Sequence, residues 1–551
     1  MLSRLRHLFE QPWALPAVVV AMQLVRLRGI LHYRDLTPGD TSYYFAGMER
    51  AAADGRFDLV WSPLYTALSL ALYGQTGDAL LVAVGTRVIT LLVLGVLTGS
   101  VLARCLPPWI AVLVSAWWVF EPVLFDTVYE VHLFSALGPV AALWISLRYP
   151  GAAGRATILA LLFVWALLQR QEYGIAAVVA GAMYVWQDVV RKRAWRPYAA
   201  ALFATLALLG MAWTRSALTY PELRVAFDDK RALNNCQNFA GGYQERHPEW
   251  TGSPTLECSG LLQEQFGTTR PSAAEMVLRN WRAMAEHYWW NIQLIPAGIE
   301  VLLFSQTSFT RNPDYVPVVR TRVAHWYLGA IAILWLAGGW LLYRGRREAA
   351  AAVRTHWTFS VLAGALIAAS AVVLVTYRPR ASYLFPLQLL LMLGTGFAVR
   401  SLASRLGLGT ALNRGAPVFA LVAVAAMPAY YQPERFPQRP LLTMYRRLLP
   451  HRAELSGLKL IAPDLATEVC NYIARGGPPC QGAYYYALRA EIDSGDLQKF
   501  LQTRGIQAAY WDAATLAEAS IKEWLSRHHE QGWTIVAQVG GPDPWVLVRK
   551  Q

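Results

Sequence analysis

The chain has 551 residues, of which 55% are hydrophobic and only 16% are charged, and its formal net charge is +14. Soluble domains carry about 25% charged residues, so this deficit excludes a typical soluble protein and indicates a polytopic membrane protein. The excess of lysine and arginine is spread over short loops between apolar segments. This positive-inside distribution excludes the single basic patch that a nucleic-acid-binding protein would need.

Apolar segments recur along the chain, and a helix needs about 20 apolar residues to cross the hydrocarbon core of a bilayer. By this criterion the sequence predicts about eleven membrane spans. The basic residues 1–13 precede the first apolar run and no small-residue cleavage site follows it, which predicts a membrane helix and not a signal peptide. Two short spans, 156–168 and 174–186, could instead form one broken or tilted pair. The predicted spans are 13–30, 79–102, 108–124, 133–147, 156–168, 174–186, 198–213, 323–342, 357–375, 384–399 and 416–429.

The charges of the loops predict the orientation of the chain, because cytoplasmic loops carry an excess of lysine and arginine. If the N-terminus is cytoplasmic, every cytoplasmic loop is basic, and the opposite loops contain acidic residues and the large polar segments. We therefore expect a multi-pass protein of the bacterial inner membrane, with a periplasmic or extracellular C-terminal domain. The predicted cytoplasmic loops are 104–105, 148–155, 191–196, 343–354 and 400–414.

The polar segments divide the chain into two predicted domains. Residues 1–430 form a transmembrane module, with a first outer loop at 31–78 and an outer insert at 215–320 that contains helical periodicity at 273–288. Residues 431–551 form a small soluble α/β domain. Its predicted strands are 458–461, 506–511, 534–539 and 545–548, and its predicted helices are 465–474, 497–504 and 521–529.

The five cysteines give an independent indication of the compartment. Cys236 and Cys258 fall together in the insert, Cys470 and Cys480 fall together in the C-terminal domain, and Cys105 falls in a cytoplasmic loop. Two close pairs on the outer side predict two disulfides in an oxidising compartment, the alternative being four unrelated thiols. Zinc is disfavoured because neither pair has a close C-x-x-C spacing or a nearby set of histidines.

The first outer loop carries two acids, Asp35 and Asp40, close to the membrane boundary, where acids are costly unless they are solvated, paired or functional. Asp40 is followed by Tyr44 and Ala46, and then by Ser-Pro-Leu-Tyr at 62–65. In these motifs the loop resembles that of the GT-C superfamily of integral membrane glycosyltransferases. The position of the family's usual second acid is occupied by Thr41.

A second motif, Arg-Pro-Arg-Ala-Ser-Tyr-Leu-Phe-Pro at 378–386, resembles the Arg-Tyr-x-Leu-Pro start of a late GT-C helix. The number of helices, the long first loop and the soluble C-terminal domain are also similar, in the manner of protein mannosyltransferases and aminoarabinose transferases. The resemblance implies an all-α, GT-C-like membrane fold with a small α/β domain. It also implies a polyprenyl-phosphate-linked sugar donor and a glycan, lipid or protein acceptor.

Glycosyl transfer needs a base for the acceptor hydroxyl, and a carboxylate at a desolvated membrane edge can have its pKa raised into a useful range. Asp40 and Asp35 are therefore the predicted catalytic residues. Asp40 could instead cap the following helix, and Asp35 could be a solvated turn residue.

The leaving lipid phosphate needs cations, and arginine binds phosphate through two parallel hydrogen bonds. Arg170, Arg378 and Arg380 are the predicted donor-phosphate ligands, although the latter two could be interfacial residues. Residues predicted to bind the acceptor or to support the site are Tyr44, Glu130, His132, Glu172 and Tyr383.

Several alternatives stay open at this point. Glu130 and His132 could form a structural pair or bind a divalent metal, and no cofactor is certain. A transporter or flippase would show paired repeats and charges within its helices, which the chain lacks apart from Arg26, Arg28 and Arg87. A non-catalytic assembly subunit, with the C-terminal domain recruiting partners, is a further alternative.

Overall fold

The computed structural model describes residues 11–121, 129–255, 257–310, 319–430, 439–474, 479–488, 492 and 496–551. The chain divides into two compact units. The first comprises Met1–Arg28 and Arg87–Gln432, and the second comprises Gly29–Thr86 and Pro433–Gln551. The first polar loop therefore belongs to the same unit as the C-terminal domain.

Within the described residues, eight helices are long and apolar enough to cross a membrane, and three further apolar helices are shorter. Helices suit a bilayer because they satisfy their backbone hydrogen bonds internally. The predicted all-α polytopic fold with a small α/β domain is confirmed. The long spans are Ala14–Tyr33, Ala79–Cys105, Glu130–Arg148, Tyr173–Arg191, Arg196–Thr214, Arg322–Arg344, Trp357–Thr376 and Ala381–Arg405, and the shorter helices are Pro108–Phe120, Ala152–Leu168 and Ala411–Ala426.

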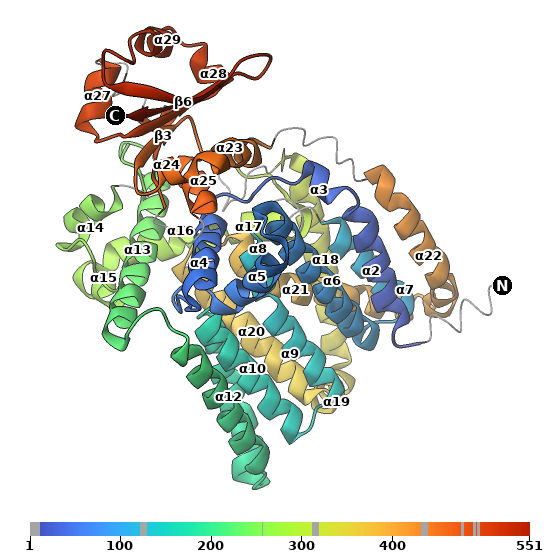
Figure 1. The fold of residues 1–551 in the computed structure, drawn as a ribbon. Coiled ribbons are helices and arrows are strands. Elements are labelled where there is room, and N and C mark those ends of the chain that lie inside the picture. The colour runs from blue at the N-terminus through green and yellow to red at the C-terminus, as the bar shows by residue number, and fades with distance from the viewer. Residues whose placement is uncertain are drawn as a thin grey trace. The chain divides into compact units, whose positions relative to one another are not determined.

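The first unit is a bundle in which α9 and α11 each pack against both α10 and α20. Figure 1 shows α9, α10 and α20 side by side. The predicted spans 156–168 and 174–186 are two separate helices, and a π-helical continuation to Arg191 lengthens the second of them. The helices of the bundle are α2 (Ala14–Arg26), α6 (Ala79–Cys105), α7 (Pro108–Phe120), α8 (Glu130–Ser135), α9 (Leu137–Arg148), α10 (Ala152–Leu168), α11 (Tyr173–Val185), η2 (Trp186–Arg191), α12 (Arg196–Thr214), α18 (Arg322–Arg344), α19 (Arg346–Thr355), α20 (Trp357–Thr376), α21 (Ala381–Arg405) and α22 (Gly409–Tyr430).

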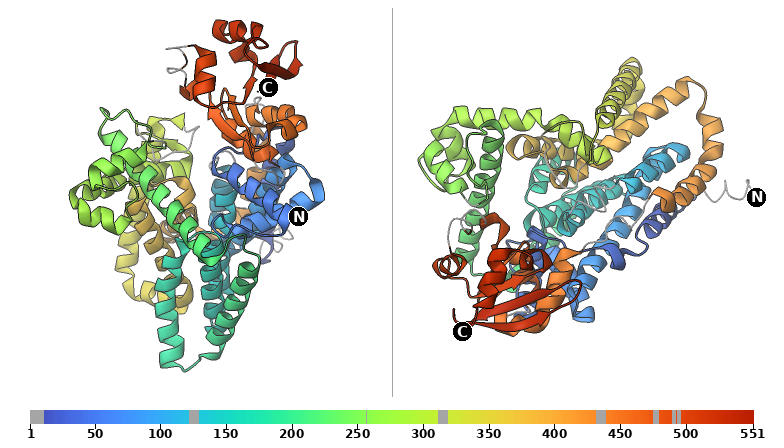
Figure 2. Two further views of the ribbon diagram at one scale, coloured as in Figure 1. Left: turned by 60° about the vertical axis from the view of Figure 1, so that its left-hand side comes forward. Right: turned by 90° about the horizontal axis from the view of Figure 1, so that it is seen from above.

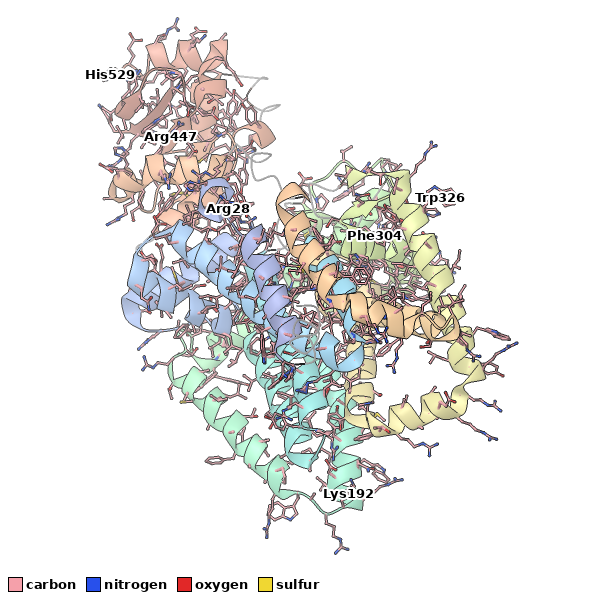
Figure 3. The ribbon with its side chains drawn as sticks, turned by 90° about the vertical axis from the view of Figure 1, so that its right-hand side faces the viewer. Arg28, Lys192, Phe304, Trp326, Arg447 and His529 are labelled. Atoms are coloured by element: carbon pink, nitrogen blue, oxygen red, sulfur yellow. A yellow bond between two sulfur atoms is a disulfide. The ribbon has the colours of Figure 1, made fainter. Side chains whose placement is uncertain are left out.

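In two of these helices, α12 and α18, only 6% of the residues in the most apolar stretch are buried. The Trp326 side chain of α18 projects from the ribbon, and Lys192 lies in the turn before α12 (Figure 3). Apolar helices that bury so little against the protein are typical of lipid-facing spans.

The insert of the first unit contains α13 (Tyr220–Arg246), α14 (Cys258–Phe266), α15 (Ala273–Arg279), α16 (Trp281–Gln293) and α17 (Ile295–Phe304). The helix predicted at 273–288 is interrupted at Asn280, whose side chain accepts a hydrogen bond from the Ala283 backbone N–H at 3.1 Å and so begins α16. The predicted Cys236–Cys258 disulfide is present and joins α13 to α14. After α17, two-residue strands β1 (Gln306–Thr307) and β2 (Val319–Arg320) pair in parallel.

His287 of α16 is buried in the insert, with its Nε2 atom 3.3 Å from Nδ2 of Asn291. Burial lowers the pKa of His287 to about 4. Because the unfolded chain takes up this proton first, the insert should lose about 3 kcal/mol of stability as the pH falls from 6.5 to 4. Hydrogen exchange of residues 236–293 across this range should show the loss in the wild type and much less of it in His287→Gln. An equal loss in both proteins would contradict this origin.

The second unit is centred on a five-stranded sheet with the order β4-β3-β5-β7-β6 (Figures 1 and 2). The strand β3 is parallel to β4 and β5, whereas β7 is antiparallel to β5 and β6. The sequence did not reveal β4, which is short and contains Gly482. The strands are β3 (Lys459–Ala462), β4 (Gln481–Tyr484), β5 (Ala508–Trp511), β6 (Trp533–Val539) and β7 (Trp545–Lys550).

Helices cover both faces of this sheet because alternate residues of each strand point to opposite faces. Ala509 and Trp511 pack with residues of α27 and α29, while Tyr510 on the other face accepts a hydrogen bond from Arg447 of α23 at 2.9 Å. The helices of this unit are α3 (Ile30–Tyr33), α4 (Asp40–Asp54), α5 (Pro63–Thr76), α23 (Pro440–Leu448), η4 (Leu449–His451), α24 (Arg452–Leu455), α25 (Ala466–Ile473), η5 (Tyr486–Leu488), α27 (Leu497–Thr503), α28 (Ala513–Leu516) and α29 (Ala519–Ser526). The predicted Cys470–Cys480 disulfide is also present.

Candidate functional site

The first polar loop places Asp40 at the first position of α4. The preceding Gly39 is the N-cap residue and has φ 63° and ψ −138°, a backbone conformation that is essentially restricted to glycine. Gly39 therefore allows the sharp change of direction that starts α4 at Asp40. The side chain of Asp40 lies outside the described part of the structure.

Aromatic side chains join α4 to α5 beyond Asp40. The ring of Tyr44 makes edge contacts with Trp61 at 5.7 Å and with Tyr65 at 5.9 Å between centroids. Ser62, at φ 43°, donates a hydrogen bond from Oγ to the Tyr44 hydroxyl at 3.4 Å. The Tyr44 and Ser-Pro-Leu-Tyr motifs, separate in the sequence, thus meet in one buried cluster.

Asp35 binds the start of α23. Its carboxylate accepts hydrogen bonds from the backbone N–H groups of Leu441 at 3.1 Å and Leu442 at 2.7 Å, and also from Leu36 at 2.8 Å. An anion is favourable there because the N-terminus of a helix carries partial positive charge. Burial raises the pKa of the Asp35 carboxyl above its ordinary value of 3.8, although the three N–H groups act in the opposite direction. The interpretation of Asp35 as a solvated turn residue is therefore wrong.

In the first unit, the turn between α10 and α11 meets the start of α21. Arg170 forms an ion pair with Glu172, with Nε 2.5 Å from Oε1, and its guanidinium lies 4.9 Å from the ring centroid of Tyr383. Arg380 lies in the same turn as Tyr383, whose backbone N–H donates to the Arg380 carbonyl at 3.0 Å. On the other side, Nε2 of Gln169 donates to the Val131 carbonyl at 3.3 Å, next to the buried His132 of α8. Five predicted residues from three separate parts of the sequence are thus brought together; we call Arg170, Arg380, His132, Glu172 and Tyr383 the arginine cluster.

Arg378 forms an ion pair outside the arginine cluster. Its guanidinium pairs with Glu245 of α13, with NH2 2.5 Å from Oε1, and Trp290 donates to the other oxygen of Glu245 at 2.8 Å. The sequence did not identify Glu245, because an acid at the end of a polar helix has no local feature that marks its partner. This contact ties the insert to the turn that carries Arg380.

Glu130 forms a buried ion pair with Arg87 of α6, with Oε1 2.9 Å from NH1 and side-chain exposures of 0% and 1%. Glu130 and His132, proposed as a pair, thus have different surroundings, since the His132 ring contacts the Tyr129 ring at a tilt, with 5.5 Å between centroids. The predicted acceptor-binding role of Glu130 stays a prediction.

Glu130→Ala should lower the free energy of unfolding by about 3–5 kcal/mol, because it removes one partner of a buried ion pair. Thermal unfolding in nanodiscs measures this effect. Glu348→Ala, which removes an exposed acid of α19, is the matched control and should leave the midpoint unchanged. Equal midpoints for both variants would show that the Arg87–Glu130 pair adds nothing to stability.

A metal site was left open by the sequence. Over the described ranges, no group of three or more His, Cys, Asp or Glu side chains is placed to hold a metal ion.

The fold defines the class: this is a polytopic membrane protein with a helical insert and an α/β domain that packs with the first polar loop. No family model and no curated protein sequence matches the chain.

Among solved structures, the chain is similar to ArnT from Cupriavidus metallidurans in the apo state, with 14% identity over 97% of both chains and a TM-score of 0.40. ArnT bound to undecaprenyl phosphate gives 13% identity over 96% of this chain and 97% of that one, with a TM-score of 0.39. The apo oligosaccharyltransferase of Archaeoglobus fulgidus gives 13% identity over 92% of this chain and 70% of that one, with a TM-score of 0.49.

Proposed function

We propose that this protein is a GT-C-type glycosyltransferase that moves a sugar from a polyprenyl-phosphate donor to an acceptor on the outer face of the bacterial inner membrane. The arginine cluster is the observation that carries this proposal. It gathers two arginines, Arg170 and Arg380, and one acid, Glu172, where apolar helices begin and end. The motifs of the first loop support the sugar chemistry.

The cluster suits the phosphate of a lipid. Arg170 lies two residues after the end of the apolar helix α10, and Arg380 directly precedes α21, so a phosphate bound there could leave its polyprenyl chain among apolar helices. Charge-assisted hydrogen bonds from guanidinium groups are roughly twice as strong as neutral ones. They also stabilise the charge that develops on the phosphate as it leaves. Arg170 is held by Glu172 and by the ring of Tyr383, which fixes the direction of its donors.

We assign the catalytic base to Asp40. In the proposed reaction the carboxylate of Asp40 takes the proton of the acceptor hydroxyl, and the acceptor oxygen attacks the anomeric carbon of the sugar. The bond from that carbon to the phosphate oxygen breaks, and the polyprenyl phosphate departs with the bonding electrons. A single displacement of this kind inverts the anomeric configuration.

The sequence predicts a catalytic role for Asp35 as well as for Asp40, but the contacts of Asp35 support a different role. Its two oxygens accept three hydrogen bonds from backbone N–H groups, two of them at the start of α23. We propose that Asp35 is a positioning residue that holds the loop bearing Asp40.

The proposal is tested with wild-type protein in lipid nanodiscs. Undecaprenyl phosphate should bind, and radiolabelled undecaprenyl-phosphate sugars should lose their label to a membrane extract that supplies acceptors. A panel of hexose and pentose donors then identifies the sugar. Failure to bind undecaprenyl phosphate, together with no transfer from any donor, would contradict the proposal.

A further inference from the structure

The helix α25 of the C-terminal domain binds the first polar loop on both sides of Asp40. The Nδ2 atom of Asn471 donates to Oγ of Ser42 at 2.9 Å, and the hydroxyl of Tyr472 donates to the backbone carbonyl of Thr37 at 2.8 Å. Both hydrogen bonds are buried. Two neighbouring side chains of α25 thus fix the chain three residues before Asp40 and two residues after it.

The ring of Tyr472 also packs against the first turns of α4. Its centroid is 4.9 Å from that of Phe45, and with Thr41 and Ser69 it lines a cavity of about 10 Å³. A cavity of this size holds at most about one water molecule. The first turn of α4 therefore has little room to shift while Tyr472 stays in place.

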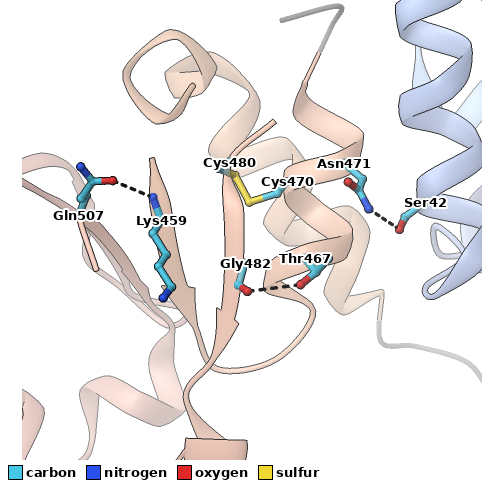
Figure 4. Close-up of a disulfide and its surroundings, with 8 residues drawn as sticks. All are labelled: Ser42, Lys459, Thr467, Cys470, Asn471, Cys480, Gly482 and Gln507. Atoms are coloured by element: carbon cyan, nitrogen blue, oxygen red, sulfur yellow. Dashed lines mark hydrogen bonds between the residues drawn. A yellow bond between two sulfur atoms is a disulfide. The ribbon is translucent and has the colours of Figure 1, made fainter. Parts of the chain in front are cut away.

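A disulfide holds α25 in this position. Cys470 directly precedes Asn471 and is bonded to Cys480, which directly precedes β4 (Figure 4). The same helix approaches Gly482 of β4 so closely that a Cβ atom there would lie 2.1 Å from the backbone nitrogen of Thr467. Because β4 pairs with β3 along its length, the position of α25 is set by the sheet.

We propose that α25, closed against β4 by the Cys470–Cys480 disulfide, is the positioning element of the catalytic loop. Asn471 and Tyr472 are its positioning residues, and they act through the Ser42 side chain and the Thr37 carbonyl on either side of Asp40. The catalytic part of this inference rests on the proposed function, whereas the coupling of α25 to the loop stands on the contacts alone.

Hydrogen exchange of residues 36–46 in nanodiscs tests the coupling without any substrate. Tyr472→Phe and Asn471→Ala should each speed exchange about fivefold, as expected for the loss of one buried hydrogen bond. Cys470→Ser with Cys480→Ser should produce a larger increase. The matched control, Cys236→Ser with Cys258→Ser, opens the disulfide of the other unit and should leave residues 36–46 unchanged. Unchanged exchange in Tyr472→Phe and Asn471→Ala would overturn the proposal.

Kinetics then separate positioning from simple stability. Tyr472→Phe keeps the ring, and it should lower kcat for sugar transfer about fivefold while KM for the donor stays at the wild-type value. A rise in KM with unchanged kcat would overturn the positioning role. If the wild type transfers no sugar, the proposed function fails, and the exchange measurement still decides whether α25 holds the loop.

Discussion

Asp40→Asn is expected to lower the rate of sugar transfer by about 10²–10⁴-fold, which is the range that general base catalysis contributes. Asparagine is close in shape to aspartate but cannot take the acceptor proton. Binding of the donor should be unchanged, because the arginine cluster supplies the phosphate contacts. Single-turnover transfer with a saturating donor measures the effect directly.

The matched control for this variant is Asp54→Asn at the other end of α4. Asp54 is exposed, and its Oδ1 atom accepts a hydrogen bond from the nearby backbone N–H of Arg56 at 2.9 Å. This variant removes the same charge from the same helix and should transfer sugar at the wild-type rate. Full activity in Asp40→Asn would remove Asp40 from the mechanism.

Arg380→Ala and Arg170→Ala are each expected to weaken binding of undecaprenyl phosphate by about 10–100-fold, the equivalent of one hydrogen bond between charged partners. Arg380→Lys should recover only part of this affinity, because lysine keeps the charge but lacks the planar fork of guanidinium. Titration of undecaprenyl phosphate into nanodiscs gives the dissociation constants.

Arg148→Ala provides the control for general charge effects. Arg148 is exposed at the end of α9, and its guanidinium lies 5.6 Å from the ring centroid of Tyr149, outside the arginine cluster. Its loss should leave undecaprenyl phosphate affinity unchanged. Equal weakening in Arg148→Ala and Arg380→Ala would mean that the affinity follows net charge and not this cluster.

The membrane helices and the two disulfides could be predicted from sequence because their determinants are local. A span such as Trp357–Thr376 is defined by its own hydropathy, and the strands β5 and β7 are defined by their own apolar runs. Cys470 and Cys480 are only 10 residues apart, so their pairing follows from proximity. The break at Asn280 was missed because the apolar periodicity continues across it.

The surroundings of the candidate residues could not be predicted in the same way. The contact of Asp35 with Leu442 spans 407 positions, and that of Ser42 with Asn471 spans 429. Nothing near Asp35 in the sequence distinguishes an acid that binds a helix start from a solvated one. Likewise, Asn471 and Tyr472 show no pattern of their own, and only their place beside Cys470 could have drawn attention to them.

The most direct test of the central claim measures donor binding and single-turnover transfer in the same nanodisc preparations of wild type and Asp40→Asn. We predict that both proteins bind undecaprenyl phosphate with equal affinity and that only the wild type transfers sugar from the loaded donor. The claim would be contradicted if Asp40→Asn transferred sugar at the wild-type rate, or if neither protein bound the lipid phosphate.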